Sequence, residues 1–341
     1  MKKEEQVLMQ MQHRKYYQDL CLMAIPLLCM AWFYYGLRPV LMCAAAFVLG
    51  NLCDRVVARL RRRPYIEQDY SSESFALLIA LLLPPACSWY VLAVAVLAGV
   101  LLGKEVFGGY GSYPFHPAAV GFVVAAVSWP EQVFRYAAPG QVLPLGSTAG
   151  VAVSTGISTT LKNGGLPSVD SMDMLLGNYA GSIGTTALLV ILACGLLLLV
   201  RRDIGLYAPL SFLAVCAAIA FLFPRQGALA GSAILETLDA RWNIVRYELM
   251  SDGMVFAAVF LVSEPFTTPR RHRGGRIVYG ALLGAVTMAF RYFGAYPQGV
   301  CFALLAINSI SEWLDAAVEQ MYALAGLRRG KPEKGGAADA S

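Results

Sequence analysis

Ten apolar segments follow one another along this chain, mostly with short polar connections between them. They cover residues 20–37, 39–54, 73–84, 86–103, 115–129, 181–200, 205–223, 250–263, 275–290 and 297–316. Only 14% of the residues are charged, about half of the ~25% that soluble domains carry. A soluble fold of 341 residues would lack the polar surface to cover such a core. The sequence therefore predicts an all-α integral membrane protein with about ten transmembrane helices.

Several of these segments are shorter than the roughly 20 residues that cross a bilayer. Short segments are tolerated where neighbouring helices bury them or where a span is broken inside the membrane. Pro84 and Pro85 interrupt one long apolar stretch, and proline disfavours helical geometry at the residue before it. We therefore expect two helices there, joined by a turn.

Most of the 27 lysines and arginines fall in alternate connections, with clusters at residues 2–15, 55–63, 201–202, 270–276 and 328–334. Cytoplasmic connections of membrane proteins carry such an excess. This pattern predicts a multi-pass protein in contact with lipid and with both termini cytoplasmic. The bacterial cell (inner) membrane is the natural setting for such a protein. Juxtamembrane clusters of this kind do not call for a nucleic acid partner.

The expected organisation has five parts. They are a cytoplasmic N-terminal segment (1–19), a first five-helix repeat (20–129), an outer loop (130–180), a second five-helix repeat (181–320) and a disordered cytoplasmic tail (321–341). Loops as long as residues 130–180 are often functional.

The division into two repeats depends on two similar blocks. Gly-Ser-Tyr-Pro at residues 111–114 recurs as Gly-Ala-Tyr-Pro at 294–297, and Phe75-Ala76 recurs as Phe256-Ala257. Five spans per half would insert the second half upside down. Inverted repeats commonly place a ligand or ion path at their interface, where helices break. Membrane re-entry turns are the simpler alternative for the breaks at 108–117 and 263–269.

No metal site is predicted, because the three histidines are scattered and no two cysteines have Cys-x-x-Cys spacing.

Four motifs resemble those of one known family. Residues 107–118 resemble its Gly-Gly-x-Gly-x-Asn-x-Phe-Asn-Pro-Ala element, and residues 175–184 resemble Leu-Gly-Asn-x-x-Gly-Ser-Ile-Gly. Residues 263–269 look like Thr-Asp-Pro-Val-Thr-Ser-Pro, and 291–300 are similar to Arg-x-x-Gly-x-Tyr-Pro-Glu-Gly-Val. The family comprises the RnfD subunit of the Rnf electron transport complex and the NqrB subunit of the sodium-pumping NADH:quinone reductase. The length of the chain favours the Rnf branch.

The resemblance implies a subunit of an ion-translocating oxidoreductase, not active alone, that couples electron transfer between ferredoxin and NAD to Na+ or H+ translocation. Its implied partners are the other Rnf subunits (RnfA, RnfB, RnfC, RnfE and RnfG) and a flavin transferase. Its implied cofactor is FMN, joined through its phosphate to a threonine of a Ser-Gly-Ala-Thr-Pro-Leu motif in the outer loop. Riboflavin or a second flavin is a further implied possibility.

The corresponding segment departs from that motif. Alignment on Leu161 places Thr159 at the flavin-bearing position and Thr160 where proline is expected, while residues 156–158 read Gly-Ile-Ser. Thr155 is a secondary candidate. A flavin transferase recognises the surrounding peptide, so an unmodified Ser/Thr-rich loop is the alternative.

Two residues at the expected breaks are ion-path candidates. Glu264 replaces the family's aspartate, and a carboxylate between Ser263 and Pro265 suits ion or helix-end contacts. Pairing with Arg270 or Arg271 is the alternative.

His116 replaces an asparagine of the family pattern. It is either a proton relay or the partner in an ordinary hydrogen bond. Asp69 is expected to cap the third helix.

Two rival functions remain for the whole chain. One is a small-solute permease with inverted repeats, and the other is a flavin-free structural subunit of the complex.

Overall fold

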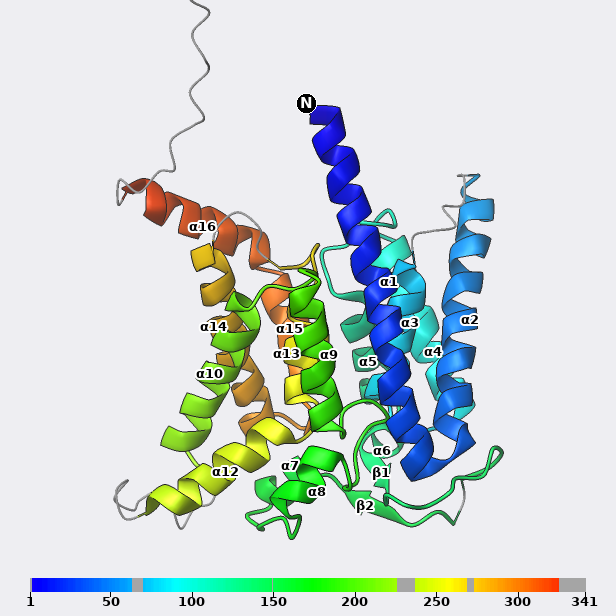
Figure 1. Cartoon of the computed structure of the whole chain (residues 1–341), viewed down its shortest axis with the longest axis vertical. Coiled ribbons are helices and arrows are strands. Elements are labelled where there is room, and N and C mark those ends of the chain that lie inside the picture. Colours follow the sequence, from blue (N-terminus) through cyan, green and yellow to red (C-terminus); the bar gives the residue numbers. More distant parts are fainter. Residues whose placement is uncertain (1, 63–69, 149, 226–236, 269–272, 325–341) are drawn as a thin grey trace, which may run out of the picture.

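The computed structural model describes residues 2–62, 70–148, 150–225, 237–268 and 273–324. Figure 1 shows a bundle of helices that run between two ends. We call them the upper end, where α2 ends at Leu60, and the lower end, where α2 begins at Leu37. The prediction for Asp69, and those that involve Arg270 and Arg271, fall outside the described residues.

In the part of the chain that the structure describes, the first half of the bundle contains five helices and one π-helical segment. They are α1 (Lys2–Tyr35), α2 (Leu37–Leu60), α3 (Ser71–Leu82), α4 (Trp89–Leu97), η1 (Ala98–Glu105) and α5 (Pro117–Ser128). Helix α1 begins well before the apolar run predicted from residue 20. Gly36 separates α1 from α2 with a φ of 78°, a backbone conformation that glycine adopts without strain. The turn predicted at Pro84 and Pro85 is confirmed, since α3 ends at Leu82 and α4 begins at Trp89.

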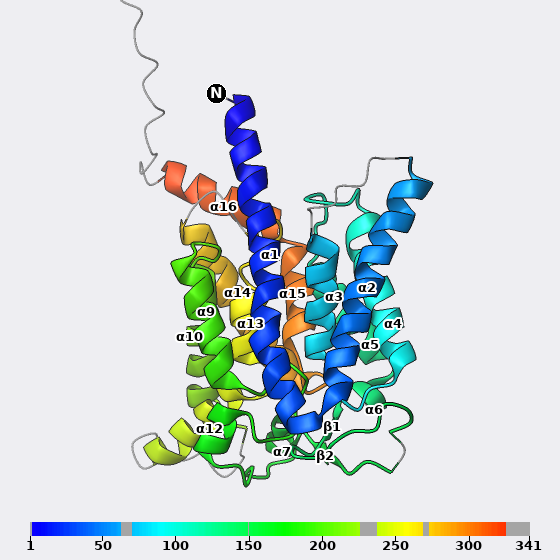
Figure 2. The same ribbon diagram turned by 45° about the vertical axis from the view of Figure 1, so that its right-hand side comes forward.

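The second half contains α9 (Leu188–Val200), α10 (Tyr207–Leu222), α13 (Met254–Phe260), α14 (Arg273–Phe293), α15 (Val300–Asn308) and α16 (Ser311–Leu324). Figure 2 shows α1 crossing in front of the seam between the two halves, and α16 lying across the upper end. Helix α16 extends to Leu324, past the expected start of the tail at residue 321.

The lower end is covered by short elements from the predicted outer loop and by α12. They are α6 (Pro130–Val133), β1 (Arg135–Ala137), β2 (Val153–Thr155), α7 (Ile157–Lys162), α8 (Ser171–Leu176) and α12 (Leu238–Met250). The two strands pair antiparallel, with Arg135 opposite Thr155. The outer loop therefore folds into a layer on the bundle.

Among the described residues, two helical stretches are long and apolar enough to cross a membrane, Arg14–Tyr35 of α1 and Leu37–Leu60. A third candidate is the pair Val300–Asn308 and Ser311–Tyr322, bent by 60°. Four shorter apolar helices have 10–17 residues, namely α3, α5, α9 and α10. All twelve residues of α3 are buried, so neighbouring helices surround it. The described chain is thus mostly helical with candidate membrane spans, consistent with an all-α membrane protein.

Close helix packing depends on glycine in the second half. A Cβ built on Gly280 of α14 would lie 2.3 Å from the carbonyl oxygen of Ala208 on α10. One turn on, a Cβ on Gly284 would lie 2.8 Å from the carbonyl oxygen of Phe212. Small residues four apart let two helix backbones approach within a membrane.

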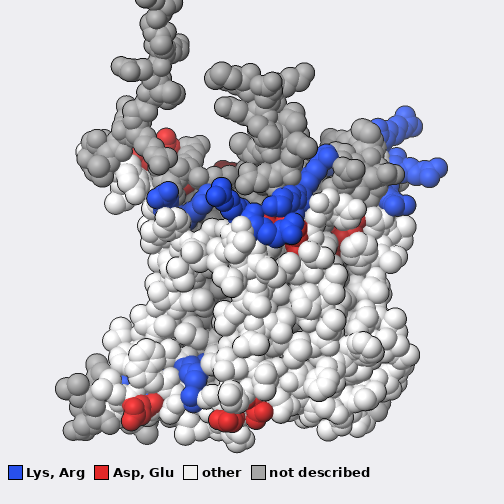
Figure 3. Space-filling model, in the orientation of Figure 1, with Lys and Arg blue, Asp and Glu red and all other residues white. Residues whose placement is uncertain are grey.

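Charge is distributed unevenly over the surface. On the face shown in Figure 3, lysine and arginine form a band near the upper end, and the sides of the bundle are almost free of charge. Exposed arginines at this end include Arg59, Arg61, Arg202 and Arg273. An apolar belt below a cationic rim suits a helix bundle that sits in a bilayer.

Candidate functional site

The segment with the three candidate threonines lies at the lower end. Thr155 is exposed at the end of β2, whereas Thr159 and Thr160 are half-buried on α7. The hydroxyl of Thr160 donates to the carbonyl oxygen of Gly156 at 3.3 Å. Within the described part of the chain, no hydrogen bond engages the hydroxyl of Thr159.

Helix α7 packs through the residues that depart from the family motif. Ile157 and Leu161 are buried in a small apolar cluster with Met174 of α8 and Tyr179. Residue Ser158 is also fully buried. Replacement of a small Gly-Ala pair by Ile157 and Ser158 thus gives the segment a side that anchors it to the protein.

Polar contacts to Ser158 fix the same helix. Its backbone N–H donates to Asp252 Oδ2 at 3.0 Å, and its hydroxyl donates to the carbonyl oxygen of Pro297 at 3.3 Å. Arg225 Nη1 donates to the carbonyl oxygen of Ser158 at 3.0 Å. Three segments that are far apart in the sequence therefore meet at one residue of α7.

Behind α7 lies a group of four buried charged side chains, which we call the lower ion cluster: Arg225, Glu248, Asp252 and Arg291. Arg291 Nη2 lies 3.2 Å from a carboxylate oxygen of Glu248 and 3.2 Å from one of Asp252. Arg225 Nε lies 3.0 Å from Glu248 Oε1. Two positive and two negative groups offset each other, which is how proteins retain buried charge.

Glu264 lies at the upper end, in the connection that follows α13. Its side chain is fully buried and accepts four hydrogen bonds. The hydroxyls of Tyr17 and Tyr113 donate to Oε1 at 2.7 and 2.8 Å. The backbone N–H groups of Phe266 and Thr267 donate to Oε2 at 2.8 and 2.7 Å. The Glu264 carboxylate thus accepts from the backbone of the turn that directly follows it.

His116 is fully buried immediately before α5. Neither imidazole nitrogen has a hydrogen-bond partner among the described residues, so the expected ordinary hydrogen bond is not seen there. The ring meets Phe75 edge-on, with centroids 5.5 Å apart. The same Phe75 ring contacts Tyr17 and Tyr113 at 5.5 and 5.6 Å. The structure thus brings His116 and the Glu264 site together around one phenylalanine, at the end opposite the threonines.

A further polar group went unnoticed in the sequence. We call Asp54, Ser72 and Lys104 the upper ion cluster, because the Lys104 ammonium lies 3.0 Å from Asp54 Oδ2 and 2.7 Å from Ser72 Oγ. Lys104 is only 1% exposed and belongs to the π-helical segment η1. Such segments occur frequently at functional sites. In the sequence, Lys104 reads only as one more cytoplasmic basic residue.

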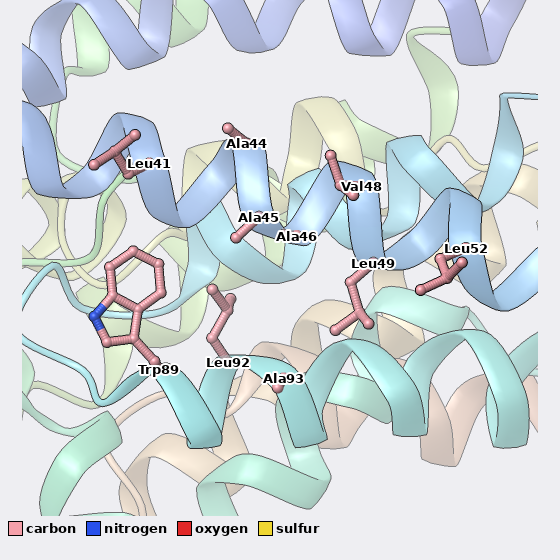
Figure 4. Close-up of a pocket in the computed structure, with 10 residues that line it drawn as sticks. All are labelled: Leu41, Ala44, Ala45, Ala46, Val48, Leu49, Leu52, Trp89, Leu92 and Ala93. Carbon is pink, nitrogen blue, oxygen red and sulfur yellow. The ribbon is translucent and has the colours of Figure 1, made fainter.

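Two grooves flank α2 and offer no polar site. The one in Figure 4 has a volume of about 580 Å³ and is lined by apolar side chains of α2 and α4, with Trp89 at one end. The other lies between α1 and α2 and has a similar volume and lining. Cofactor sites combine apolar walls with a few converging polar groups, so neither groove resembles one.

Short buried helices within an apolar bundle that also has long apolar helices indicate the class: a multi-pass membrane protein. Residues 2–323 match the NQR2, RnfD, RnfE family. The chain belongs to this family.

Two similar proteins carry the same name. The D subunit of the ion-translocating oxidoreductase complex from Pseudomonas aeruginosa strain UCBPP-PA14 is 33% identical over 308 residues, which cover 85% of each chain. The protein of the same name from Cronobacter sakazakii is 30% identical over 324 residues, or 84% of this chain and 88% of the relative. The name describes a member of a multi-subunit assembly, and the resemblance inferred from the four motifs is confirmed.

Proposed function

We propose that this chain is the RnfD-type membrane subunit of an Rnf complex and carries FMN on its lower, outer end, joined to Thr159. The complex would couple electron transfer between ferredoxin and NAD to translocation of Na+ or H+. A flavin supplies one- and two-electron redox chemistry that side chains alone cannot. The observation that carries the proposal is the position of Thr159, on an anchored helix at the aligned site of a family member. Its half-buried hydroxyl has no hydrogen-bond partner among the described residues.

The neighbouring residues suit such a group. Ser158, Ile157 and Leu161 face the protein, which leaves the hydroxyl of Thr159 available. The lower ion cluster holds the backbone of α7 in place, so a group on Thr159 would keep a defined position. Thr155 is a less suitable acceptor, because it lies on an exposed strand end without this support.

In-gel fluorescence tests the attachment. The wild-type chain and the Thr159→Ala, Thr155→Ala and Thr160→Ala variants are each co-expressed with a flavin transferase and run on a denaturing gel. We expect ultraviolet-excited fluorescence at the 36.8 kDa chain in all except Thr159→Ala. A fluorescent Thr159→Ala band moves the assignment to another threonine. A wild-type band without fluorescence would favour the alternative of a flavin-free structural subunit. Solute flux through the chain in liposomes, without redox partners, would favour a permease.

We further propose that ten helices cross the membrane as two inverted repeats, with both termini in the cytoplasm. The helices are α1, α2, α3, α4 with η1, α5, α9, α10, α13, α14 and α15. Support comes from the two short buried helices: α3 begins beside the upper ion cluster, whereas α13 begins beside the lower one. They therefore run in opposite directions. A green fluorescent protein fused after residue 341 should fluoresce, as it does only in the cytoplasm, and a dark fusion contradicts this topology.

Glu264 and His116 are proposed to lie on the ion path. The buried carboxylate lies at a helix break, beside an imidazole that has no partner among the described residues. Such an arrangement is seen along ion and proton paths. The test compares Glu264→Gln with Glu131→Gln, an exposed carboxylate at the lower end, in the whole complex reconstituted in vesicles. We expect less ion uptake per electron only in Glu264→Gln. Equal uptake in both variants leaves Glu264 a structural role.

A further inference from the structure

The guanidinium of Arg225 contacts α7, the helix that carries Thr159, and one of its nitrogens has no hydrogen-bond partner among the described residues. Its side chain is 5% exposed and rests on the ring of Tyr292, with 4.7 Å between the guanidinium carbon and the ring centroid. Nη1 is used by Ser158 and Nε faces Glu248. Nη2 is buried and finds no acceptor among the described residues. A buried donor left without an acceptor destabilises the fold, so a function for this nitrogen would explain why it is kept.

The position of Arg225 relative to Thr159 suggests a function for this buried donor. The carbonyl that Arg225 contacts belongs to the peptide unit between Ser158 and Thr159. The guanidinium is therefore held against the backbone of the residue directly before the one that carries the candidate hydroxyl. Lys162, the last residue of α7, carries a second cation on the segment, and its Nζ donates to the carbonyl oxygen of Gly294.

The lower ion cluster already pairs its two arginines with two carboxylates. What Arg225 offers a phosphodiester on Thr159 is therefore the donor on Nη2 and not a surplus of positive charge. The planar guanidinium donates along two parallel directions and suits phosphate oxygens better than an ammonium does. Burial strengthens such a contact, because water does not compete for it.

We propose that Arg225 is a positioning residue that binds the phosphate joined to Thr159 through Nη2 and so holds the flavin against the lower end. This inference rests on the proposed attachment at Thr159. It adds a site that holds a phosphodiester, built from the loop after α10 and from the ring of Tyr292 on α14.

The test uses the full chain co-expressed with a flavin transferase, in wild-type form and as three variants. Arg225→Lys keeps the positive charge but loses the planar guanidinium that donates along two parallel directions. Arg225→Gln combined with Glu248→Gln removes both members of a buried pair, so that neither is left unpaired. Arg135→Gln is the matched control, because it removes an exposed arginine from the same end of the protein.

Two measurements report on the phosphate and not on activity. They are the phosphorus NMR resonance of the protein-linked phosphodiester and the fluorescence anisotropy of the flavin. We expect the resonance to shift and the anisotropy to fall in both Arg225 variants, while Arg135→Gln retains the wild-type values. In the wild-type protein alone, we also expect the resonance to move when the chain is unfolded in detergent.

The outcomes separate this inference from the proposed function. A fluorescent wild-type band whose phosphorus resonance is the same folded and unfolded overturns the role of Arg225 and leaves the attachment intact. If Arg225→Lys and the double variant keep the wild-type resonance and anisotropy, the role of Arg225 is likewise overturned and the attachment stays intact. A wild-type chain without flavin overturns both.

Discussion

Tyr113 and Glu264 are 151 residues apart in the chain, and the hydroxyl of the first donates to a carboxylate oxygen of the second at 2.8 Å. Each lies in a break between helices, one in either half of the bundle. Tyr17 of α1 donates to the same oxygen. The contact therefore joins both halves and the helix that crosses their seam.

Loss of this hydroxyl should weaken the seam. A hydrogen bond to a charged group contributes about 1.5–3 kcal/mol, so we expect Tyr113→Phe to lower the melting temperature of the purified protein by roughly 3–6 °C. The control is Tyr16→Phe, because the buried Tyr16 hydroxyl has no hydrogen-bond partner among the described residues. Equal melting temperatures for the two variants would contradict the account of the Glu264 site.

The upper ion cluster should behave as a unit. Lys104→Met leaves the Asp54 carboxylate buried without its cation, a loss of about 3–5 kcal/mol. The double variant with Asp54→Asn removes both charges and should recover most of the lost stability. Thermal unfolding in detergent measures each variant. Additive losses in the double variant would show that the two groups do not stabilise each other.

Close packing of α10 against α14 makes a steric prediction. Gly280→Ala places a Cβ 2.3 Å from a backbone oxygen, and overpacking of this kind costs about 1–3 kcal/mol. Gly146→Ala is a suitable control, since its Cβ would meet nothing within 4 Å. We expect a lower melting temperature only for Gly280→Ala. If α10 can move away freely, the two variants will melt alike.

Asp203, between α9 and α10, predicts a dependence of stability on pH. Burial and the nearby Asp19 raise the pKa of Asp203 to about 6, and Lys15 and Arg201 oppose the rise. In the unfolded chain this pKa is ~3.9, so the folded state holds the proton more tightly. The ionised Asp203 therefore destabilises the fold above pH 6, and this cost fades as the pH falls towards ~4.

Asp203→Asn should thus melt higher than the wild type at pH 7.5 and equally at pH 4.5. The exposed Asp239→Asn serves as the control and should show no such difference. If the difference in melting temperature between Asp203→Asn and the wild type is the same at pH 7.5 and at pH 4.5, protonation of Asp203 in the folded state is contradicted.

The sequence predicted the helical membrane fold because apolar runs and proline breaks are local signals, as at Pro84 and Pro85. Glu264 and His116 stood out because they fall in recognisable motifs, whereas Tyr17, which donates to Glu264, falls in none. It could not show that His116 and Glu264 share the Phe75 ring, because contacts between distant segments leave no local pattern. The two ion clusters were missed for the same reason. Asp252 and Lys104 look like ordinary span-end residues until the fold brings their partners to them.

The proposed function depends most on the modification of Thr159. Mass spectrometry of the peptide that spans residues 150–162, from protein co-expressed with a flavin transferase, tests it directly. We predict the added mass of FMN less water, with fragment ions that assign it to Thr159. An unmodified peptide, or a modification assigned to Thr155, would contradict the central claim.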